Sequence, residues 1–356
     1  MKVPYNDLSR IHLPLKEKFH ECLDQVIDNS SFVGPSPTFV EAFKNFTGAK
    51  YCVPCNSGTD ALYLAIKSLE LKPLSKIAVP AMTFAATAMS VVNAGHIPVF
   101  IDVDTQTGLM LVDDPEIKKC DCVIPVHLYG QCVDVEYLLE IGEIPVIEDC
   151  AQAHGAQINE KHVGTMGTIG CFSFYAGKNL GALGDAGACI TNDETLAKKM
   201  TQYGKLGANP QDRYDHQTSG IKSNMDYLQS LFLTEKLKHL EEWTKERIKI
   251  GETYSSSFVD KVSRSKIGRD VYHVFYTLQN NREDYTQYMN EKGVQTNIQY
   301  PTSLPNLSCF KNFFRECPNA EEFSKKCVSV PLFPGMTQEE IDFTLNCHTS
   351  YPSPGI

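Results

Sequence analysis

The chain has 356 residues, of which 42% are hydrophobic and 21% charged, fractions that are ordinary for a globular protein. This length allows one large domain or two, each with a substantial core. Acidic residues (43) outnumber lysines and arginines (33), which gives a net charge of -10. That balance argues against nucleic acid or an anionic membrane as a partner, because both attract a basic surface. No continuous apolar stretch of about 18 residues is present, so no membrane span is expected.

The basic residues are uneven in kind, because few of them are arginines. They are Arg10, Arg213, Arg247, Arg264, Arg269, Arg282 and Arg315. A phosphate or carboxylate bound by this chain therefore relies on backbone N–H groups, hydroxyls, lysines or one of few guanidiniums.

The cysteines are numerous (13) and odd in count. Cys122, Cys150, Cys171 and Cys189 lie inside apolar runs, which is typical of small buried side chains in a reducing compartment. Cys52-x-x-Cys55 has no second pair at zinc spacing, so packing is favoured over a redox or metal role and no metal is expected. The N-terminus lacks the apolar core of a signal peptide. A cytoplasmic protein is predicted.

The first two-thirds of the chain alternates short apolar runs with helical patterns. Helices are predicted over residues 61–70 and 83–94, and strands over 77–80, 98–103, 122–126, 145–149, 170–174 and 188–191. Short apolar strands separated by helices predict an α/β fold whose mostly parallel sheet is covered on both faces. Ligands of such sheets bind beyond the carboxyl ends of the strands.

The last third begins with a helical pattern over residues 227–258, interpreted as the link between two domains. Strands at 271–278 and 294–300, a helix at 282–292 and a final helix at 337–346 follow. Thr337 and Glu340 have the spacing of a capping box. We therefore expect a large domain over residues 1–240 and a small α/β domain over residues 241–356.

Two positions point to an anion site and an acid at the same edge of the sheet. Residues 56–60 precede the helix at 61, and small residues at a helix start expose backbone N–H groups to an anion. The alternative is a plain N-cap by Ser57 or Thr59. Asp149 ends an apolar strand, where a carboxylate needs a cationic or hydrogen-bonding partner. Functional and structural interpretations of Asp149 are equally open from the residues alone.

Lys178 lies in a glycine-containing turn after the strand at 170–174. A lone lysine in a loop is usually solvated, but apolar surroundings lower its pKa and make the amine a nucleophile. Pyridoxal phosphate needs such a lysine, an acid for its ring nitrogen and a dipole-rich phosphate cup. Asp149 provides the acid, Gly58, Thr59 and Ser173 the cup, and Phe84 a flat partner for the ring.

Several long motifs, in order along almost the whole chain, resemble the sugar aminotransferases of the DegT/DnrJ/StrS group, which are fold type I enzymes. They are residues 3–8 (VPYNDL), 32–35 (FVGP), 57–62 (SGTDAL), 80–84 (PAMTF), 126–131 (VHLYGQ), 148–155 (EDCAQAHG), 172–181 (FSFYAGKNLG) and 330–337 (VPLFPGMT).

The resemblance implies a role for each matching position. Lys178 matches the Schiff-base lysine, Asp149 the acid on the pyridinium nitrogen, and Gln152 the side chain near the ring hydroxyl. Gly58, Thr59 and Ser173 match the phosphate cup, and Phe84 lies in the segment that packs on the ring. The family forms homodimers with active sites at the subunit interface, so a homodimer is expected.

Two departures from the family pattern concern the site. Residues 220–226 read GIKSNMD, with Lys222 where an Asn usually reaches the partner's cofactor phosphate. Lys222 is carried over as a phosphate ligand because an ammonium also binds phosphate. The usual His-Tyr-Pro is Gln299-Tyr300-Pro301 here, and Tyr300 and Tyr5 are candidates for contacting the sugar or nucleotide.

The predicted function is ping-pong transamination with pyridoxal 5'-phosphate. The resemblance implies L-glutamate as donor and a nucleotide-linked keto-deoxysugar, of the dTDP type, as acceptor. Alternatives are aminotransfer to a cyclitol, sugar dehydration, and a non-catalytic regulatory role. The dehydratase branch carries His in place of the Schiff-base lysine, and Lys178 speaks against it. For His127, His154 and His216 a structural role is favoured over substrate contact.

Overall fold

The computed structural model describes residues 1–258 and 262–352. Its main sheet has the strand order β1-β9-β8-β5, from β1 (Tyr51–Cys55), β9 (Gly187–Thr191), β8 (Ile169–Ser173) and β5 (Ile147–Asp149). Parallel bridges from Val123 to Val146 and from Val126 to Asp149 continue it into β4 (Cys122–Val123), β2 (Lys76–Pro80) and β3 (Ile97–Ile101). Only β9 runs against its neighbours among these strands. The predicted, mostly parallel sheet is confirmed.

Both faces of the sheet are buried, as the uninterrupted apolar runs predict. Ile77 and Val79 of β2 pack on one face with α4 (Gly58–Ser68) and α5 (Ala86–Asn93). Ala78, between them, packs on the other with α6 (Val135–Glu140). Helix α3 (Pro37–Thr47) covers the same second face through aromatic contacts with β8. The expected helix at 83–94 begins at Ala86, because residues 81–85 form a bend above the sheet.

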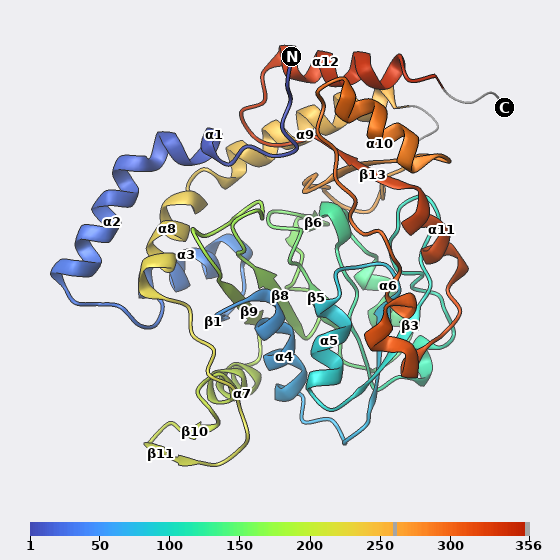
Figure 1. The fold of residues 1–356 in the computed structure, drawn as a ribbon. Helices are drawn as coiled ribbons and strands as arrows, with labels where there is room; N and C mark the ends of the chain where they lie inside the picture. The colour runs from blue at the N-terminus through green and yellow to red at the C-terminus, as the bar shows by residue number, and fades with distance from the viewer. Residues whose placement is uncertain (259–261, 353–356) are drawn as a thin grey trace.

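The helix expected over residues 227–258 is two helices, which corrects the prediction. α8 (Tyr227–Leu237) packs against α2 (Lys16–Asp28) and α3, whereas α9 (Leu240–Ser257) packs against α12 (Gln338–Thr349). The two segments have different partners, so the axis breaks at Lys238 and His239 (Figure 1). Whether a domain boundary lies at residue 240 stays a prediction.

The last third pairs β12 (Phe275–Leu278) with β13 (Cys327–Val330) in antiparallel register. The expected strand at 271–278 is shorter, because the amides of Val271 and Val274 donate to Gly130 and Tyr129 instead. The expected strand at 294–300 is wrong: Val294 and Asn297 make isolated bridges, to Val3 and Ser329. The N-terminal segment therefore lies against the C-terminal elements (Figure 1).

The remaining elements are short or peripheral. They are α1 (Ser9–His12), α7 (Glu194–Gly204), α10 (Arg282–Glu291), α11 (Pro318–Lys326), the pairs β6 (Gln157–Ile158) with β7 (Lys161–His162) and β10 (Ala208–Asn209) with β11 (Asp212–His216), and five 3-10 turns. The capping box of Thr337 and Glu340 at the start of α12 is confirmed. Among the described residues, no helix has both the length and the apolarity to cross a bilayer.

Candidate active site

A cavity of about 640 Å³ opens at the carboxyl ends of β5 and β8. Its walls come from the main sheet, the N-terminal segment and the C-terminal third of the chain. Nine of the ten site residues expected from the sequence line this cavity: Tyr5, Gly58, Thr59, Phe84, Asp149, Gln152, Ser173, Lys178 and Tyr300. Residues spread over 296 positions of the sequence therefore meet at the edge that the strand pattern indicates.

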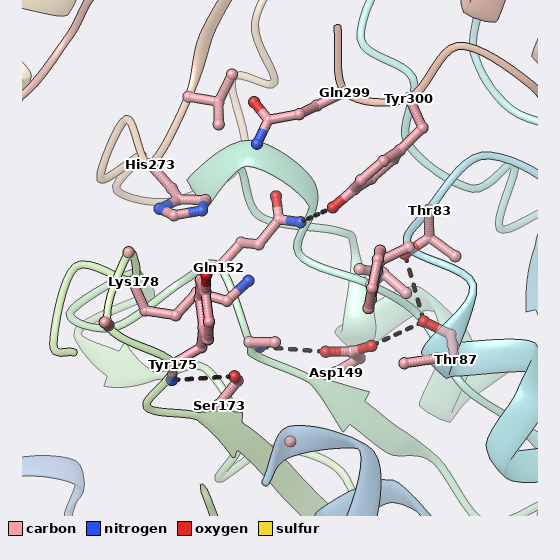
Figure 2. Close-up of a pocket in the computed structure, with 18 of the residues that line it drawn as sticks. Thr83, Thr87, Asp149, Gln152, Ser173, Tyr175, Lys178, His273, Gln299 and Tyr300 are labelled. Atoms are coloured by element: carbon pink, nitrogen blue, oxygen red, sulfur yellow. Dashed lines mark hydrogen bonds between the residues drawn. The ribbon is translucent and has the colours of Figure 1, made fainter. Parts of the chain in front are cut away.

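Lys178 lies in the loop that follows β8, and Figure 2 shows its side chain reaching across the cavity floor. Its amide donates to the Tyr175 carbonyl (2.8 Å), and a Cβ on Gly181 would lie 2.3 Å from the Ala176 oxygen. The loop is therefore tightly folded. Desolvation lowers the pKa of Lys178 to about 8, although the Asp149 carboxylate opposes that shift. An amine with this pKa is partly neutral near physiological pH and is nucleophilic.

Asp149 is 5% exposed and ends β5. Its Oδ2 accepts a hydrogen bond from Thr87 Oγ1 (2.9 Å) and its Oδ1 accepts one from the Ala151 amide (3.1 Å). Burial raises the pKa of Asp149, while these two hydrogen bonds and the charge of Lys178 oppose the rise. A buried carboxylate held in this way favours a cationic N–H partner in the cavity.

The amino end of α4 forms a cradle for an anion. Ser57 caps the helix, accepting a hydrogen bond from the Asp60 amide (3.1 Å). A Cβ on Gly58 would lie 2.6 Å from the Cβ of Ser173, so only glycine fits where the two segments meet. Backbone N–H groups, the helix dipole and the Thr59 and Ser173 hydroxyls thus surround one end of the cavity, as a phosphate monoester requires.

Polar and aromatic side chains that contact one another form the wall opposite the cradle. Gln152 accepts from the Tyr129 amide (2.7 Å) and donates to the Tyr300 hydroxyl (3.0 Å). The rings of Phe84 and Tyr300 lie 5.7 Å apart, and Phe84 is 57% exposed. The Tyr5 hydroxyl donates to Gln299 Oε1 (2.6 Å), which attaches the N-terminal segment to the rim. Desolvation raises the pKa of Tyr5 to about 12, so the phenol stays protonated.

Lys222 is not among the described residues that line the cavity of this single chain. It is exposed and forms an isolated antiparallel bridge with Lys205. The next residue, Ser223, donates to Asp60 of α4 (2.6 Å), so the segment is tied to the helix that forms the cradle. A contact between Lys222 and a phosphate stays a prediction.

The three histidines considered from the sequence do not line the cavity among the described residues. His127 is buried 3.1 Å from Glu148, His154 packs against Phe172 and Phe174, and His216 contacts the Leu206 carbonyl. Burial lowers the pKa of His154 to about 3. These environments favour the structural interpretation.

Four cavity residues that touch or flank the site were missed from the sequence: Thr87, Arg247, His273 and Gln299. Gln299 was seen only as a departure from a family pattern. His273 Nδ1 lies 2.9 Å from Asn179 Oδ1, beside Lys178, and burial holds its pKa well below the usual range. Thr87 follows Thr83 by four residues, and Arg247 follows Trp243 by four. That spacing places Trp243 and Arg247 on one face of α9, and it would do the same for Thr83 and Thr87 in the helix expected over residues 83–94. It was the available signal.

A buried amine, a hydrogen-bonded acid and an anion cradle in one cavity are the groups that pyridoxal 5'-phosphate requires. The model of the DegT/DnrJ/EryC1/StrS aminotransferase family matches residues 15–347. The chain belongs to this family, and it is a pyridoxal-phosphate-dependent aminotransferase of fold type I. The predictions of family, fold and cofactor are confirmed.

Relatives match nearly the whole chain. A pleiotropic regulatory protein of Geobacillus stearothermophilus is 36% identical, covering 97% of each chain. A UDP-N-acetyl-3-dehydro-alpha-D-glucosamine 3-aminotransferase of Acidithiobacillus ferrooxidans is 34% identical over 95% of each. A dTDP-3-amino-3,6-dideoxy-alpha-D-galactopyranose transaminase of Aneurinibacillus thermoaerophilus is 31% identical, over 98% of this chain and 99% of that one.

Solved structures have the same fold. DesV of S. venezuelae superposes with a TM-score of 0.93 at 26% identity, covering 100% of this chain and 99% of that one. The ntda protein of Bacillus subtilis, with bound cofactor PMP, has a TM-score of 0.88 at 26% identity, over 97% of this chain and 84% of that one.

Proposed function

We propose that this protein transfers an amino group from L-glutamate to the keto carbon of a nucleotide-linked deoxysugar. The observation that carries the proposal is the placement of Lys178 and Asp149 in one cavity with the Gly58–Ser173 cradle. Family membership supports aminotransfer. The relatives from Acidithiobacillus and Aneurinibacillus act on UDP- and dTDP-linked sugars, which supports the acceptor class.

Each residue of the cavity would have a separate role in this reaction. When bound, the cofactor supplies an electron sink for the pair of electrons left on the donor's α-carbon. Lys178 Nζ would hold the cofactor covalently and, once displaced by the donor, would take the proton from that carbon and deliver it to the cofactor carbon on the other side of the amino nitrogen. Asp149 would hold the proton on the ring nitrogen, because a buried carboxylate stabilises an adjacent cation. Gly58, Thr59 and Ser173 would bind the phosphate.

The orientation of the cofactor would come from the opposite wall. Gln152 is fixed by the Tyr129 amide and the Tyr300 hydroxyl, so its amide is presented in one direction toward the ring hydroxyl. Phe84 would cover one face of the ring. Its 57% exposure in the single chain fits a site that is completed by a second copy, and a homodimer with Lys222 reaching the neighbouring phosphate is part of the proposal.

The relatives leave the identity of the nucleotide open between UDP and dTDP, and dTDP remains the prediction from the sequence. The cytoplasmic location also remains a proposal. A cyclitol acceptor differs from a sugar nucleotide by lacking the diphosphate. The set of acceptors used to test the proposal should therefore include one cyclitol ketone. Turnover of that compound alone would contradict the sugar acceptor and support a cyclitol.

A regulatory role is the alternative with a specific observation behind it, the name of the Geobacillus relative. A non-catalytic protein does not need a desolvated lysine beside a buried acid, whereas this chain has both. The cofactor's visible absorbance separates the two roles. Glutamate should bleach the band of a working aminotransferase, and no change with any amino donor would support the regulator.

The decisive experiment combines that half-reaction with a panel of UDP- and dTDP-linked keto-sugars, the product position being read by NMR. Lys178→Ala should abolish turnover, and Asp149→Asn should retain cofactor but slow proton removal by about 10²-fold or more. Full activity of Lys178→Ala would contradict the assignment of the lysine, and an unchanged rate in Asp149→Asn would contradict that of the acid.

A further inference from the structure

His273 is a residue of the cavity wall to which the proposed chemistry gives no role. It lies two residues before β12, is partly buried, and lines the cavity together with Lys178. Figure 2 shows its ring above the side chain of Lys178. The backbone around His273 is fixed, because the amides of Val271 and Val274 donate to the loop at residues 129–130 (3.0 and 3.3 Å). The fold thus holds the base of this side chain at the cavity wall.

Asn179 decides which nitrogen of the His273 ring carries the hydrogen. The Nδ2 of Asn179 donates to the Val271 carbonyl (3.3 Å), so its Oδ1 faces His273 Nδ1, at 2.9 Å. An amide oxygen only accepts, and Nδ1 therefore carries the hydrogen. Burial and the nearby charge of Lys178 hold the pKa of His273 well below its ordinary value, so the ring is neutral at neutral pH. Nε2 then has a lone pair and no hydrogen.

The lone pair of His273 Nε2 has no hydrogen-bond donor among residues 1–258 and 262–352. An acceptor in a cavity wall that a ligand covers costs free energy unless the ligand donates to it. Gln299, which also lines the cavity, has the opposite character, because the Tyr5 hydroxyl occupies its Oε1 (2.6 Å) and leaves the amide N–H groups. The wall therefore offers both an acceptor and a donor, which suits the hydroxyl groups of a ligand.

Of the molecules that the proposed reaction brings into the cavity, the sugar is the one with O–H groups to donate. The carboxylates of glutamate only accept, and its nitrogen is bonded to the cofactor during the transfer. The amine of Lys178 makes no hydrogen bond with His273 in the described structure, and the reaction itself occupies that amine. A hydroxyl on the carbon next to the keto carbon is two bonds from the reacting atom. Asn179, the residue after Lys178, links His273 to the same place.

We propose that His273 Nε2 accepts a hydrogen bond from the hydroxyl next to the keto carbon of the sugar, and so selects keto-sugars that carry this hydroxyl over deoxygenated ones. The proposal rests on the aminotransferase function proposed above and deepens it, because it names a feature of the acceptor. A site that hydrogen-bonds a substrate hydroxyl rejects the analogue without it, because the partner in the wall is then left unpaired.

The probes for the test are pairs of dTDP- and UDP-linked keto-6-deoxyhexoses with the keto group at C3 or C4. The members of each pair differ only in having or lacking the hydroxyl at the other of these two carbons. Each sugar is mixed with the protein in its pyridoxamine phosphate form, and the return of the visible band gives the rate. In the pair that reacts, the parent should prefer the member with the hydroxyl by about 10-fold or more.

The variants separate the two nitrogens of the ring. His273→Asn keeps an N–H group near Nδ1 for Asn179 but has no acceptor near Nε2, so the preference should fall to about threefold or less. His273→Gln places an amide oxygen near Nε2 and should retain more of the preference. His20→Gln changes an exposed histidine of α2 and should keep the preference of the parent. If His273→Asn does not fold, His273→Phe, a flat ring without an acceptor, replaces it.

The ratio within a pair distinguishes this role from a structural one. An equal loss of rate for both members in His273→Asn would overturn the proposal, since it would indicate a role in shaping the Lys178 loop. Equal rates for both members in the parent, or a preference for the deoxygenated one, would also overturn it and leave the aminotransferase function standing. A protein that reacts with glutamate but with none of the sugars would instead contradict the proposed acceptor class, and this proposal with it.

Discussion

Thr87 Oγ1 donates a hydrogen bond of 2.9 Å to Asp149 Oδ2 from the first turn of α5. Thr83 Oγ1 lies 3.3 Å from the same hydroxyl, so a chain of two threonines ends at the buried acid (Figure 2). A hydroxyl that donates to a carboxylate favours its ionised form. The ionised form of the acid assigned to the cofactor's ring nitrogen is therefore favoured by a residue 62 positions earlier in the chain.

Thr87→Val should raise the pKa of Asp149 further, because it removes one of the hydrogen bonds that counteract the effect of burial on this pKa. The rate of the glutamate half-reaction should fall by about 10-fold or more, since a hydrogen bond to a charged group contributes about 1.5–3 kcal/mol, and the loss should be larger at low pH. Stopped-flow absorbance at several pH values measures it. Thr87→Ser keeps the hydroxyl and should behave like the parent, and equal rates in all three proteins would contradict the role of Thr87.

Lys178 should capture the cofactor with a rate that rises through about pH 8. The amine reacts with an aldehyde in its neutral form, and its pKa is lowered to about 8. Absorbance during addition of pyridoxal phosphate to cofactor-free protein gives this profile. Asp149→Asn should move the midpoint to lower pH, because the Asp149 carboxylate stabilises the ammonium. Free N-acetyl-lysine, whose midpoint is about 10.4, is the reference. A protein midpoint equal to that value would contradict the desolvated environment of Lys178.

Gly58→Ala should weaken cofactor binding and lower stability, because the new Cβ would lie 2.6 Å from the Cβ of Ser173 and 3.1 Å from its Cα. Forcing the two segments apart costs about 1–3 kcal/mol and moves the N–H groups of the cradle. Cofactor affinity from fluorescence titration should fall by roughly 10-fold. Gly142→Ala adds a methyl group where no atom lies within 4 Å, so it should change neither property. Equal affinities in the two variants would count against the cradle.

The sequence contained enough to place the chemistry of the site at one edge of the sheet. Asp149 and Ser173 end apolar strands and Gly58 begins a helix, and parallel strands bring such positions together. Two elements were misjudged because backbone partners decide them. Apolar runs at 271–278 and 294–300 suit a strand, yet the first part of one bonds to the loop at Tyr129 and Gly130 and the other makes only isolated bridges. Periodicity carries no information about such partners.

The placement of Arg247 in the cavity wall was missed for a related reason. In the pattern of the helix at 227–258, a charged residue next to Glu246 and Lys245 resembles part of a solvated face. The buried side of α9 includes position 247, together with Trp243 and Ile250. The contacts of Arg247 with the carbonyls of Tyr272, His273 and Leu332 are made to distant segments, so they cannot be read from the local sequence.

Lys236 lies away from the site and leads to a prediction about how the stability of the protein depends on pH. It is fully buried on α8 with its Nζ 2.9 Å from His12 Nε2, and burial lowers its pKa to about 8. In the unfolded chain this lysine has its ordinary pKa of about 10.4. Between these two pKa values the unfolded chain therefore binds the proton more tightly than the folded chain. The contribution of Lys236 to the free energy of unfolding is therefore unfavourable below pH 8 and becomes less so as pH rises from 8 to about 10.4.

Lys236→Met should raise the free energy of unfolding at pH 7 by about 1–3 kcal/mol, because the penalty for burying the ammonium is removed. The difference between parent and variant should shrink as the pH rises through that window, where the parent's lysine loses its proton. Urea unfolding at pH 7, 8, 9 and 10 measures both effects, and taking the difference cancels the other groups that titrate there. Lys238→Met changes an exposed lysine of the neighbouring turn and should show no such trend. A difference that is constant from pH 7 to 10 would mean that Lys236 keeps its ordinary pKa in the folded chain.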